Sequence, residues 1–170
     1  HTMALILSWN RKVLDYHQFV TQKRWNERSQ TTGNWGCGPL YRLSEQTLGL
    51  LGFGYIGRAV AQRSKAFGLK VLAYSRRPDR SIAQNLGVEL TGLEELLRRS
   101  DYVSLHLPLT VETRHFINSK TINLMKPGSV LINTSRGGLV DEEALVDALR
   151  RCRLGGALLD VYEKAPLPVD

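Results

Sequence analysis

Three glycines follow one another at a Gly-x-Gly-x-x-Gly spacing. The segment LGLLGFGYIGRAV places Gly52, Gly54 and Gly57 between an apolar run and a helical pattern. In this motif the first glycine permits a tight turn, the second lets the backbone approach a diphosphate, and the third lets helix and strand pack closely. The first helical residues, Tyr55 and Ile56, bring free N–H groups towards the phosphates. We therefore predict a dinucleotide site, with a flexible glycine turn as the alternative.

A hydroxyl and two guanidinium groups follow the next apolar run. Ser75, Arg76 and Arg77 come directly after Lys70–Tyr74. A carboxylate at this strand end ordinarily accepts hydrogen bonds from the adenosine ribose and repels a 2′-phosphate, whereas a hydroxyl followed by arginines favours that phosphate. The nearest acid, Asp79, lies further along the loop. We predict a preference for NADP(H), with NAD(H) possible and a solvated basic turn as the alternative.

Short apolar runs alternate with helical patterns through the rest of the chain. Continuous apolar runs are typical of parallel strands that are buried on both faces. We therefore predict an α/β fold, a doubly wound parallel sheet of the Rossmann type, over residues 47–160. The expected strands are Thr47–Leu51, Lys70–Tyr74, Tyr102–Leu105, Ser129–Asn133 and Ala157–Leu159, with a short one at Val88–Leu90, and the expected helices are Tyr55–Phe67, Gly92–Arg99 and Asp141–Arg150.

The chain begins with an amphipathic pattern. Apolar residues recur at steps of three or four positions from Ile6 to Val20, which predicts one long helix over residues 3–28. We assign residues 1–28 to this leading helix, and residues 29–46, rich in Gly, Ser, Thr and Asn, to a loop. The apolar stripe has two possible partners: a second copy of the chain, or the rest of the protein itself.

Bulk composition narrows the class of protein. The chain has 170 residues, of which 42% are hydrophobic, which suits one globular domain. Its net charge of +7 indicates an anionic partner, but no basic stripe is interleaved with aromatic residues, so we expect no nucleic-acid binding. Cys37 and Cys152 have neither disulfide-scaffold nor zinc-site spacing, so we expect no metal. The sequence shows no signal peptide and no membrane-length apolar segment, so we expect a cytoplasmic protein without a membrane partner.

Polar or conformationally special residues also follow the remaining strands. The carboxyl ends of parallel strands meet at one edge of a sheet, where ligands bind. We therefore expect the residues after these strands to outline one site. They are His106, Leu107, Pro108, Thr134, Ser135, Arg136 and Asp160.

Four segments together resemble the nucleotide-binding domain of the D-isomer-specific 2-hydroxyacid dehydrogenases. They are TLGLLGFGYIGRAV, DYVSLHLPLTVETRHFIN, KPGSVLINTSRGGLVDEEALVDALR and LLDVYEKAPLP, in family order across residues 47–168. The resemblance implies hydride transfer between a nicotinamide cofactor and a 2-oxo acid or D-2-hydroxy acid. The residues after the second strand resemble those of the NADP-preferring glyoxylate and hydroxypyruvate reductases. A homodimer, formed through this domain and its leading helix, is also implied.

The resemblance assigns roles to several strand-end residues. Arg136 matches the arginine that grips the substrate carboxylate and polarises the carbonyl being reduced, with a surface arginine as the alternative. Asp160 matches the acid that contacts the nicotinamide carboxamide, with a turn-capping role as the alternative. Leu107 and Pro108 resemble the wall of the nicotinamide ribose, and Thr134 and Ser135 belong to the same cofactor edge.

The resemblance also identifies what the chain lacks. Catalysis in the family uses a histidine as general acid–base, paired with a glutamate. Ala165 stands at the position of that glutamate, and Glu163 matches a different, non-catalytic acid. His106 is not the catalytic histidine and is expected to pack or to contact the cofactor, and His115 carries no motif.

The catalytic histidine and the second, substrate-side domain are absent from this sequence. We therefore predict that residues 1–170 are the dinucleotide-binding domain of a longer enzyme, inactive on its own. Ala165 is either a natural variant or an introduced substitution. The alternative function is a dinucleotide-sensing, non-catalytic protein that resembles the transcriptional corepressors of this fold.

Overall fold

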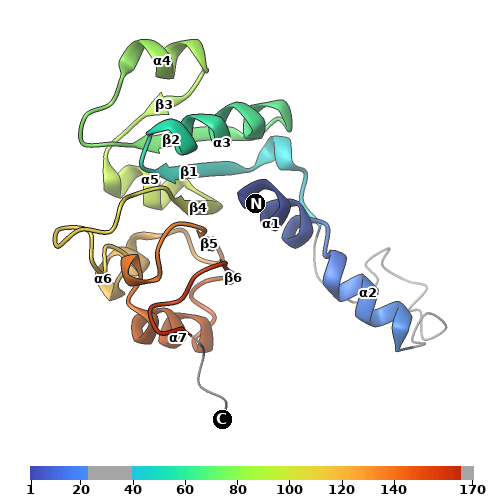
Figure 1. The fold of residues 1–170 in the computed structure, drawn as a ribbon. Helices are drawn as coiled ribbons and strands as arrows, with labels where there is room; N and C mark the ends of the chain where they lie inside the picture. Colours follow the sequence, from blue (N-terminus) through green and yellow to red (C-terminus); the bar gives the residue numbers. More distant parts are fainter. Residues whose placement is uncertain (23–39, 166–170) are drawn as a thin grey trace.

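The computed structural model describes residues 1–22 and 40–165, which form a six-stranded sheet with helices on both faces (Figure 1). The strand order is β3-β2-β1-β4-β5-β6, and all five neighbouring pairs are parallel. This order reverses between β1 and β4, where doubly wound sheets bind their ligands. The predicted Rossmann-type fold is confirmed. The strands are β1 (Thr47–Leu51), β2 (Lys70–Tyr74), β3 (Glu89–Leu90), β4 (Tyr102–Leu105), β5 (Val130–Asn133) and β6 (Gly156–Leu159).

The helices include two that the sequence patterns did not predict, α4 and α6. Each has only six residues, and each begins at a side-chain cap: the carboxylate of Asp79 accepts from the Ile82 N–H, and the amide oxygen of Asn118 accepts from the Thr121 N–H. All predicted strands, and the three helices predicted after residue 47, agree with the structure to within one residue at each end. The helices are α1 (Thr2–Asn10), α2 (Val13–Thr21), α3 (Tyr55–Ala66), α4 (Arg80–Asn85), α5 (Leu93–Arg99), α6 (Ser119–Leu124) and α7 (Glu142–Arg150), with short 3-10 turns η2 (Leu43–Glu45) and η3 (Gly137–Leu139).

The sheet separates two apolar cores. Side chains alternate between the faces of a strand, so Leu48 and Leu50 of β1 join one core, whereas Leu51 joins the other. Helices α1, α3 and α4 cover the first core, and α5, α6 and α7 cover the second. Burial on both faces explains why the strands are continuous apolar runs.

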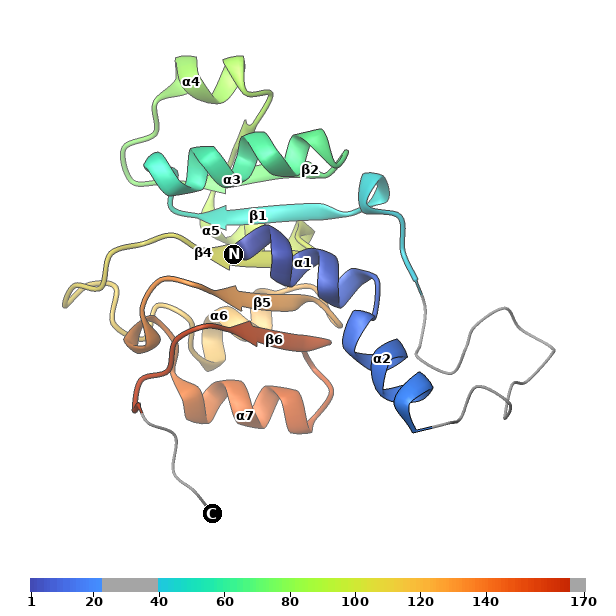
Figure 2. The same ribbon diagram turned by 45° about the vertical axis from the view of Figure 1, so that its right-hand side comes forward.

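The prediction of one long leading helix is wrong within the described residues. The helix breaks after Asn10, and Lys12 has a φ of +54°. Helix α1 packs on the sheet, where Ile6 is fully buried and the Asn10 amide donates to the Tyr102 hydroxyl at 3.3 Å. Helix α2 buries no residue and extends away from the sheet in both views (Figures 1 and 2). The apolar stripe is therefore buried against the sheet in α1 and largely exposed in α2, and no glycine or proline marks the break.

Part of the sequence prediction lies outside the described residues. This holds for residues 23–28 of the leading helix, for residues 29–39 of the following loop, and for Cys37. Over residues 1–22 and 40–165, no helix combines the length and the apolar character needed to cross a membrane.

Candidate cofactor-binding site

The glycine loop is tightly packed at two of its three glycines. Gly52 has a φ of +107°, and its N–H donates to the Tyr74 carbonyl oxygen at 2.9 Å. A Cβ on Gly52 would overlap the carbonyl group of His106, and a Cβ on Gly57 would overlap the carbonyl oxygen of Gly52. Both positions therefore require glycine for the packing of the loop itself.

Gly54 differs because open space surrounds it. No heavy atom outside its chain neighbours lies within 4 Å of the position that a Cβ would take. Gly54 is the N-cap of α3, and no side chain caps this helix. Tyr55 and Ile56, in the first turn, are 92% and 69% exposed. The first-turn N–H groups therefore face accessible space, which is the arrangement that binds a diphosphate.

The strands that border the site end at the same level. In the sheet register, Leu51 pairs with both Tyr74 and Leu105, Leu105 pairs with Asn133, and Asn133 pairs with Leu159. We call these five residues the terminal row. Figure 2 shows the arrowheads of β1, β4, β5 and β6 on the same edge of the sheet. The next residue after each strand therefore lies at this one edge of the sheet. These residues are Gly52, Ser75, His106, Thr134 and Asp160.

A hollow of about 490 Å³ lies between the start of α3 and the ends of β5 and β6. Its size falls in the range of small-molecule sites, about 300–1,000 Å³. Four predicted site residues line it together: Tyr55, Ile56, Thr134 and Asp160. The hollow therefore brings together predicted site residues from α3 and from the ends of β5 and β6.

The first residues of the chain also line this hollow, which the sequence patterns did not indicate. The Nε2 atom of His1 lies 3.4 Å from Oδ1 of Asp160, and the hydroxyls of Thr2 and Thr134 are 3.1 Å apart. The start of α1 therefore contributes to the site, and the rest of this helix contributes to the core. The helical period of the apolar residues does not predict these contacts, because they are made by polar side chains at the start of the helix.

Arg136 projects from a turn whose backbone is fixed by its neighbours. The Asn133 amide donates to the Arg136 carbonyl oxygen at 2.9 Å, and the Ser135 hydroxyl donates to the Leu105 carbonyl oxygen at 2.7 Å. The Arg136 side chain is exposed, and its Nη1 donates to the Ser135 carbonyl oxygen at 2.7 Å. The guanidinium group is accessible to solvent, and Arg136 does not line the hollow.

The residues after β2 lie on the other side of the glycine loop. Ser75 is partly buried, and Arg76 and Arg77 are exposed. Asp79 caps α4, because its Oδ1 accepts from the Ile82 N–H at 3.1 Å. The acid nearest to Ser75 in the sequence therefore caps a helix, and the two arginines that follow Ser75 are exposed.

The loop after β4 carries Leu107 and Pro108. Thr113 holds this loop: its hydroxyl donates to the Pro108 carbonyl oxygen at 2.6 Å and accepts from the Thr110 N–H at 2.8 Å. The pKa of the exposed Glu112 is lowered, first by the hydrogen bond from Thr110 and to a smaller extent by the charge of Arg76. The ring of Phe116, in the same loop, stacks on Tyr74 with the centroids 6.4 Å apart, so the loop packs beside the end of β2.

His106 packs behind the glycine loop. Its Nε2 lies 3.0 Å from the Ser104 hydroxyl, and burial lowers the pKa of its imidazole to about 4. The ring is therefore neutral at physiological pH. This geometry favours a packing role over acid–base chemistry.

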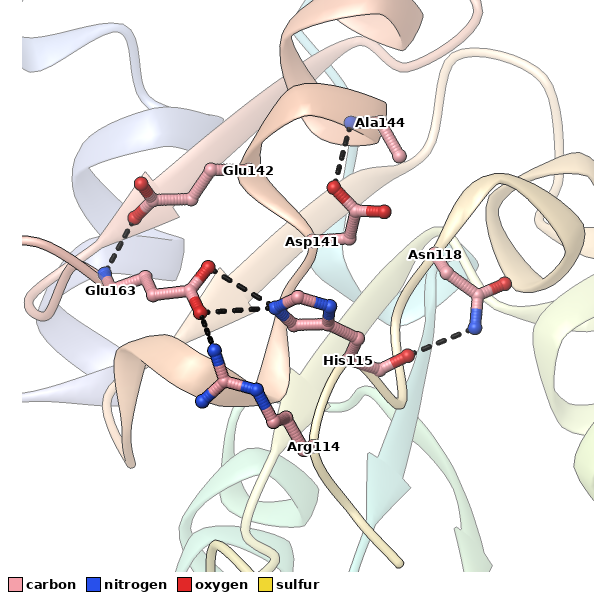
Figure 3. A network of polar contacts seen from close by, with 7 residues as sticks. All are labelled: Arg114, His115, Asn118, Asp141, Glu142, Ala144 and Glu163. Carbon is pink, nitrogen blue, oxygen red and sulfur yellow. Dashed lines mark hydrogen bonds and ion pairs between the residues drawn. The ribbon is translucent and has the colours of Figure 1, made fainter. Parts of the chain in front are cut away.

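A polar network around Glu163 was not predicted (Figure 3). Both carboxylate oxygens of Glu163 lie 3.1 Å from Nε2 of His115, and the guanidinium of Arg114 forms an ion pair with Oε1. Sequence patterns miss this network because 48 residues separate His115 from Glu163. Ala165, two residues further along, is exposed.

Comparison with known proteins identifies the relatives of this chain. Residues 3–170 match the family described as "D-isomer specific 2-hydroxyacid dehydrogenase, NAD binding domain". The glyoxylate reductase of Thermococcus litoralis is 44% identical over 167 residues, with 96% of this chain and 49% of the relative covered. The glyoxylate reductase of Aeropyrum pernix is 45% identical over 170 residues, with 98% and 49% covered. The chain thus spans about half the length of the curated relatives it matches.

Solved structures agree with these matches. The D-lactate dehydrogenase of Aquifex aeolicus, complexed with NAD and lactic acid, superposes with a TM-score of 0.87 at 40% identity, covering 96% of this chain and 47% of that one. A glyoxylate reductase from Paecilomyes thermophila gives a TM-score of 0.82 at 35% identity, with 98% and 48% covered. The resemblance stated from the sequence segments is confirmed.

Proposed function

The chain belongs to the D-isomer-specific 2-hydroxyacid dehydrogenase family, and from that premise we propose that it binds a nicotinamide dinucleotide along the carboxyl edge of its sheet, within a longer oxidoreductase. That enzyme transfers hydride between the cofactor and a 2-oxo acid or D-2-hydroxy acid, in the manner of a glyoxylate or hydroxypyruvate reductase. The observation that carries the proposal is the open approach to Gly54 above a level terminal row. The cofactor supplies the hydride, and the protein orients it and supplies charge.

We propose that the cofactor is NADP(H) in preference to NAD(H). In this proposal the partly buried Ser75 hydroxyl donates to the 2′-phosphate, and the exposed Arg76 and Arg77 supply positive charge. Asp79, the acid nearest to Ser75 in the sequence, already accepts a backbone hydrogen bond at the start of α4.

The remaining roles follow from position along the edge. Arg136 grips the substrate carboxylate with its planar guanidinium group. Asp160 and Thr134 contact the nicotinamide end from within the hollow. Leu107 and Pro108 form the wall of the nicotinamide ribose. Ser135 fixes the turn that carries Arg136, because its hydroxyl donates to the Leu105 carbonyl oxygen.

A second candidate is a dinucleotide-sensing protein without catalysis. Ala165 favours it, because an exposed methyl group stands where the family places a catalytic carboxylate. A 2-oxo acid reductase assay on the full-length protein separates the two: turnover supports the enzyme, and cofactor binding without turnover supports the sensor.

We further propose a cytoplasmic homodimer in which α2 contacts the partner. Val13, Leu14 and Val20 on this helix are all more than half exposed, which a monomer leaves in water. Light scattering after size exclusion tests this, and a monomer at all concentrations would contradict it.

The first experiment is a pair of calorimetric titrations of this chain with NADPH and NADH. Tenfold tighter binding of NADPH, about 1.4 kcal/mol, supports the 2′-phosphate site. Equal or tighter binding of NADH assigns the arginines to a solvated turn. Absence of binding by both cofactors contradicts the proposed function.

A further inference from the structure

We infer that Arg114, His115, Glu142 and Glu163 form a clamp that positions the nicotinamide half of the site. The clamp holds the segment after β6, residues 160–165, against the turn that carries Arg136. This inference rests on the proposed function, and it adds positioning residues that act through Asp160 and Arg136.

Glu163 is the centre of the clamp (Figure 3). Its side chain is only 21% exposed and accepts from both Arg114 and His115. A carboxylate only accepts hydrogen bonds, so the proton of the contact lies on Nε2 of His115. The backbone N–H of Glu163 donates to Oε1 of Glu142 at 2.6 Å, so the same residue is held by its main chain as well.

The clamp joins three segments that are distant in sequence. Arg114 and His115 lie in the loop after β4, Glu142 begins α7, and Glu163 follows β6. The loop is itself fixed to the Arg136 turn, because the His115 N–H donates to the Gly138 carbonyl oxygen at 2.8 Å. This backbone hydrogen bond therefore connects the clamp to the turn that presents Arg136.

Two backbone features indicate that the surrounding structure holds the segment after β6 against the Arg136 turn. His115 has a φ of +49°, a conformation that costs a non-glycine residue about 1–2 kcal/mol. Such outliers persist only when the surrounding structure holds them, and they cluster at functional sites. Gly137, directly after Arg136, has no room for a Cβ, because the carbonyl group of Tyr162 and the nitrogen of Glu163 occupy that space.

The position of the clamp determines what it controls. Asp160, at the hollow, precedes Glu163 by three residues, and Ala165 follows it by two. No hydrogen bond or ion pair joins Ser75, Arg76 or Arg77, which we assign to the adenosine end, to a clamp residue in the described part of the chain. The nearest approach is the stacking of Phe116 on Tyr74, with ring centroids 6.4 Å apart. Loosening the clamp should therefore move the nicotinamide contacts and leave the adenosine contacts in place.

The test compares a whole cofactor with one that lacks nicotinamide. Glu163→Gln removes the charge, and His115→Asn removes the imidazole while keeping a residue that tolerates positive φ. We expect each variant to bind NADPH about tenfold more weakly and to bind 2′-phospho-ADP-ribose as the wild type does. Glu89→Gln is the control, because it breaks the exposed Glu89–Arg99 pair at the far strand β3. It should alter neither affinity.

The outcomes separate the clamp from the proposed function. If both clamp variants lose affinity equally for NADPH and for 2′-phospho-ADP-ribose, the clamp supports the fold in general, and the inference is overturned. Unchanged binding of both ligands would overturn it too. If the wild-type chain binds neither ligand, the proposed function itself fails. If Glu163→Gln does not fold, the comparison rests on His115→Asn, which leaves the Glu163–Arg114 and Glu163–Glu142 contacts intact.

Discussion

Replacing Gly54 with alanine should separate cofactor binding from folding. The added methyl group meets no heavy atom within 4 Å, and the backbone φ of −78° is ordinary for alanine. Alanine restricts the unfolded chain, which stabilises the fold by about 0.4–1 kcal/mol. It is also a poorer N-cap than glycine, which costs a similar amount. These effects oppose each other, so the free energy of unfolding should stay within about 1 kcal/mol of the wild type, or about 2–4 °C in Tm.

Cofactor affinity should respond quite differently. The methyl group occupies the space through which the diphosphate approaches the start of α3, so the backbone contact is lost. We expect at least tenfold weaker binding of NADPH, about 1.4 kcal/mol. Calorimetric titration gives the affinity, and thermal unfolding of the same sample gives the stability.

Gly92→Ala is the matched control. Gly92 is also an N-cap with open space around it, but it begins α5 beyond the edge strand β3. Its stability should change as that of Gly54→Ala does, while its affinity for NADPH should be that of the wild type. Wild-type affinity in Gly54→Ala would refute the path of the diphosphate over α3. If Gly54→Ala lowers the free energy of unfolding much more than Gly92→Ala does, the space around Gly54 is not open and the reasoning is refuted.

Three further predictions concern charge. Ser75→Asp should weaken NADPH binding at least about tenfold and spare NADH in parallel titrations, because a carboxylate repels the 2′-phosphate; equal loss for both cofactors would contradict this. Burial lowers the pKa of His106 from 6.5 to about 4, so the unfolded chain binds more protons than the folded chain between these pH values. The free energy of unfolding should therefore fall as the pH drops from 6.5 to about 4, by at most about 3 kcal/mol. Urea unfolding of His106→Asn should lack this component, and an identical pH profile would exclude His106 as its source. In the full-length protein, Ala165→Glu should raise the pKa of the general-acid histidine, so reductase activity should persist to higher pH, and an unchanged pH–rate profile would count against it.

The sheet and the glycine motif could be predicted because both depend on local sequence. Each strand is a continuous apolar run, and the motif lies between a strand and a helix, so the order of elements fixed which residues leave the same edge. The register of the terminal row then follows from parallel pairing. This is why the sequence alone predicts that Ser75, Thr134 and Asp160 lie at one edge of the sheet.

Contacts between distant segments could not be predicted in this way. The break at Lys12 depends on α1 packing against the sheet, and its left-handed backbone has no glycine to mark it. The pairing of His115 with Glu163 and the contact of His1 with Asp160 join residues that no motif connects. Helices α4 and α6 are too short for an apolar period to repeat, so only their caps could have indicated them.

The terminal row separates positions that maintain the fold from positions that can determine ligand preference. Residues on the strand side of the row are buried in one of the two cores, so substitutions there are tested by stability alone. One step beyond the row, Ser75, Thr134 and Asp160 are at least partly exposed, so these three strand ends offer positions that tolerate exchange without rebuilding the scaffold, whereas Gly52 and His106 are held by the packing of the glycine loop. Relatives with different cofactors or substrates can thus diverge one strand end at a time, and a mutational scan of this chain should show stability and ligand preference changing at separate positions.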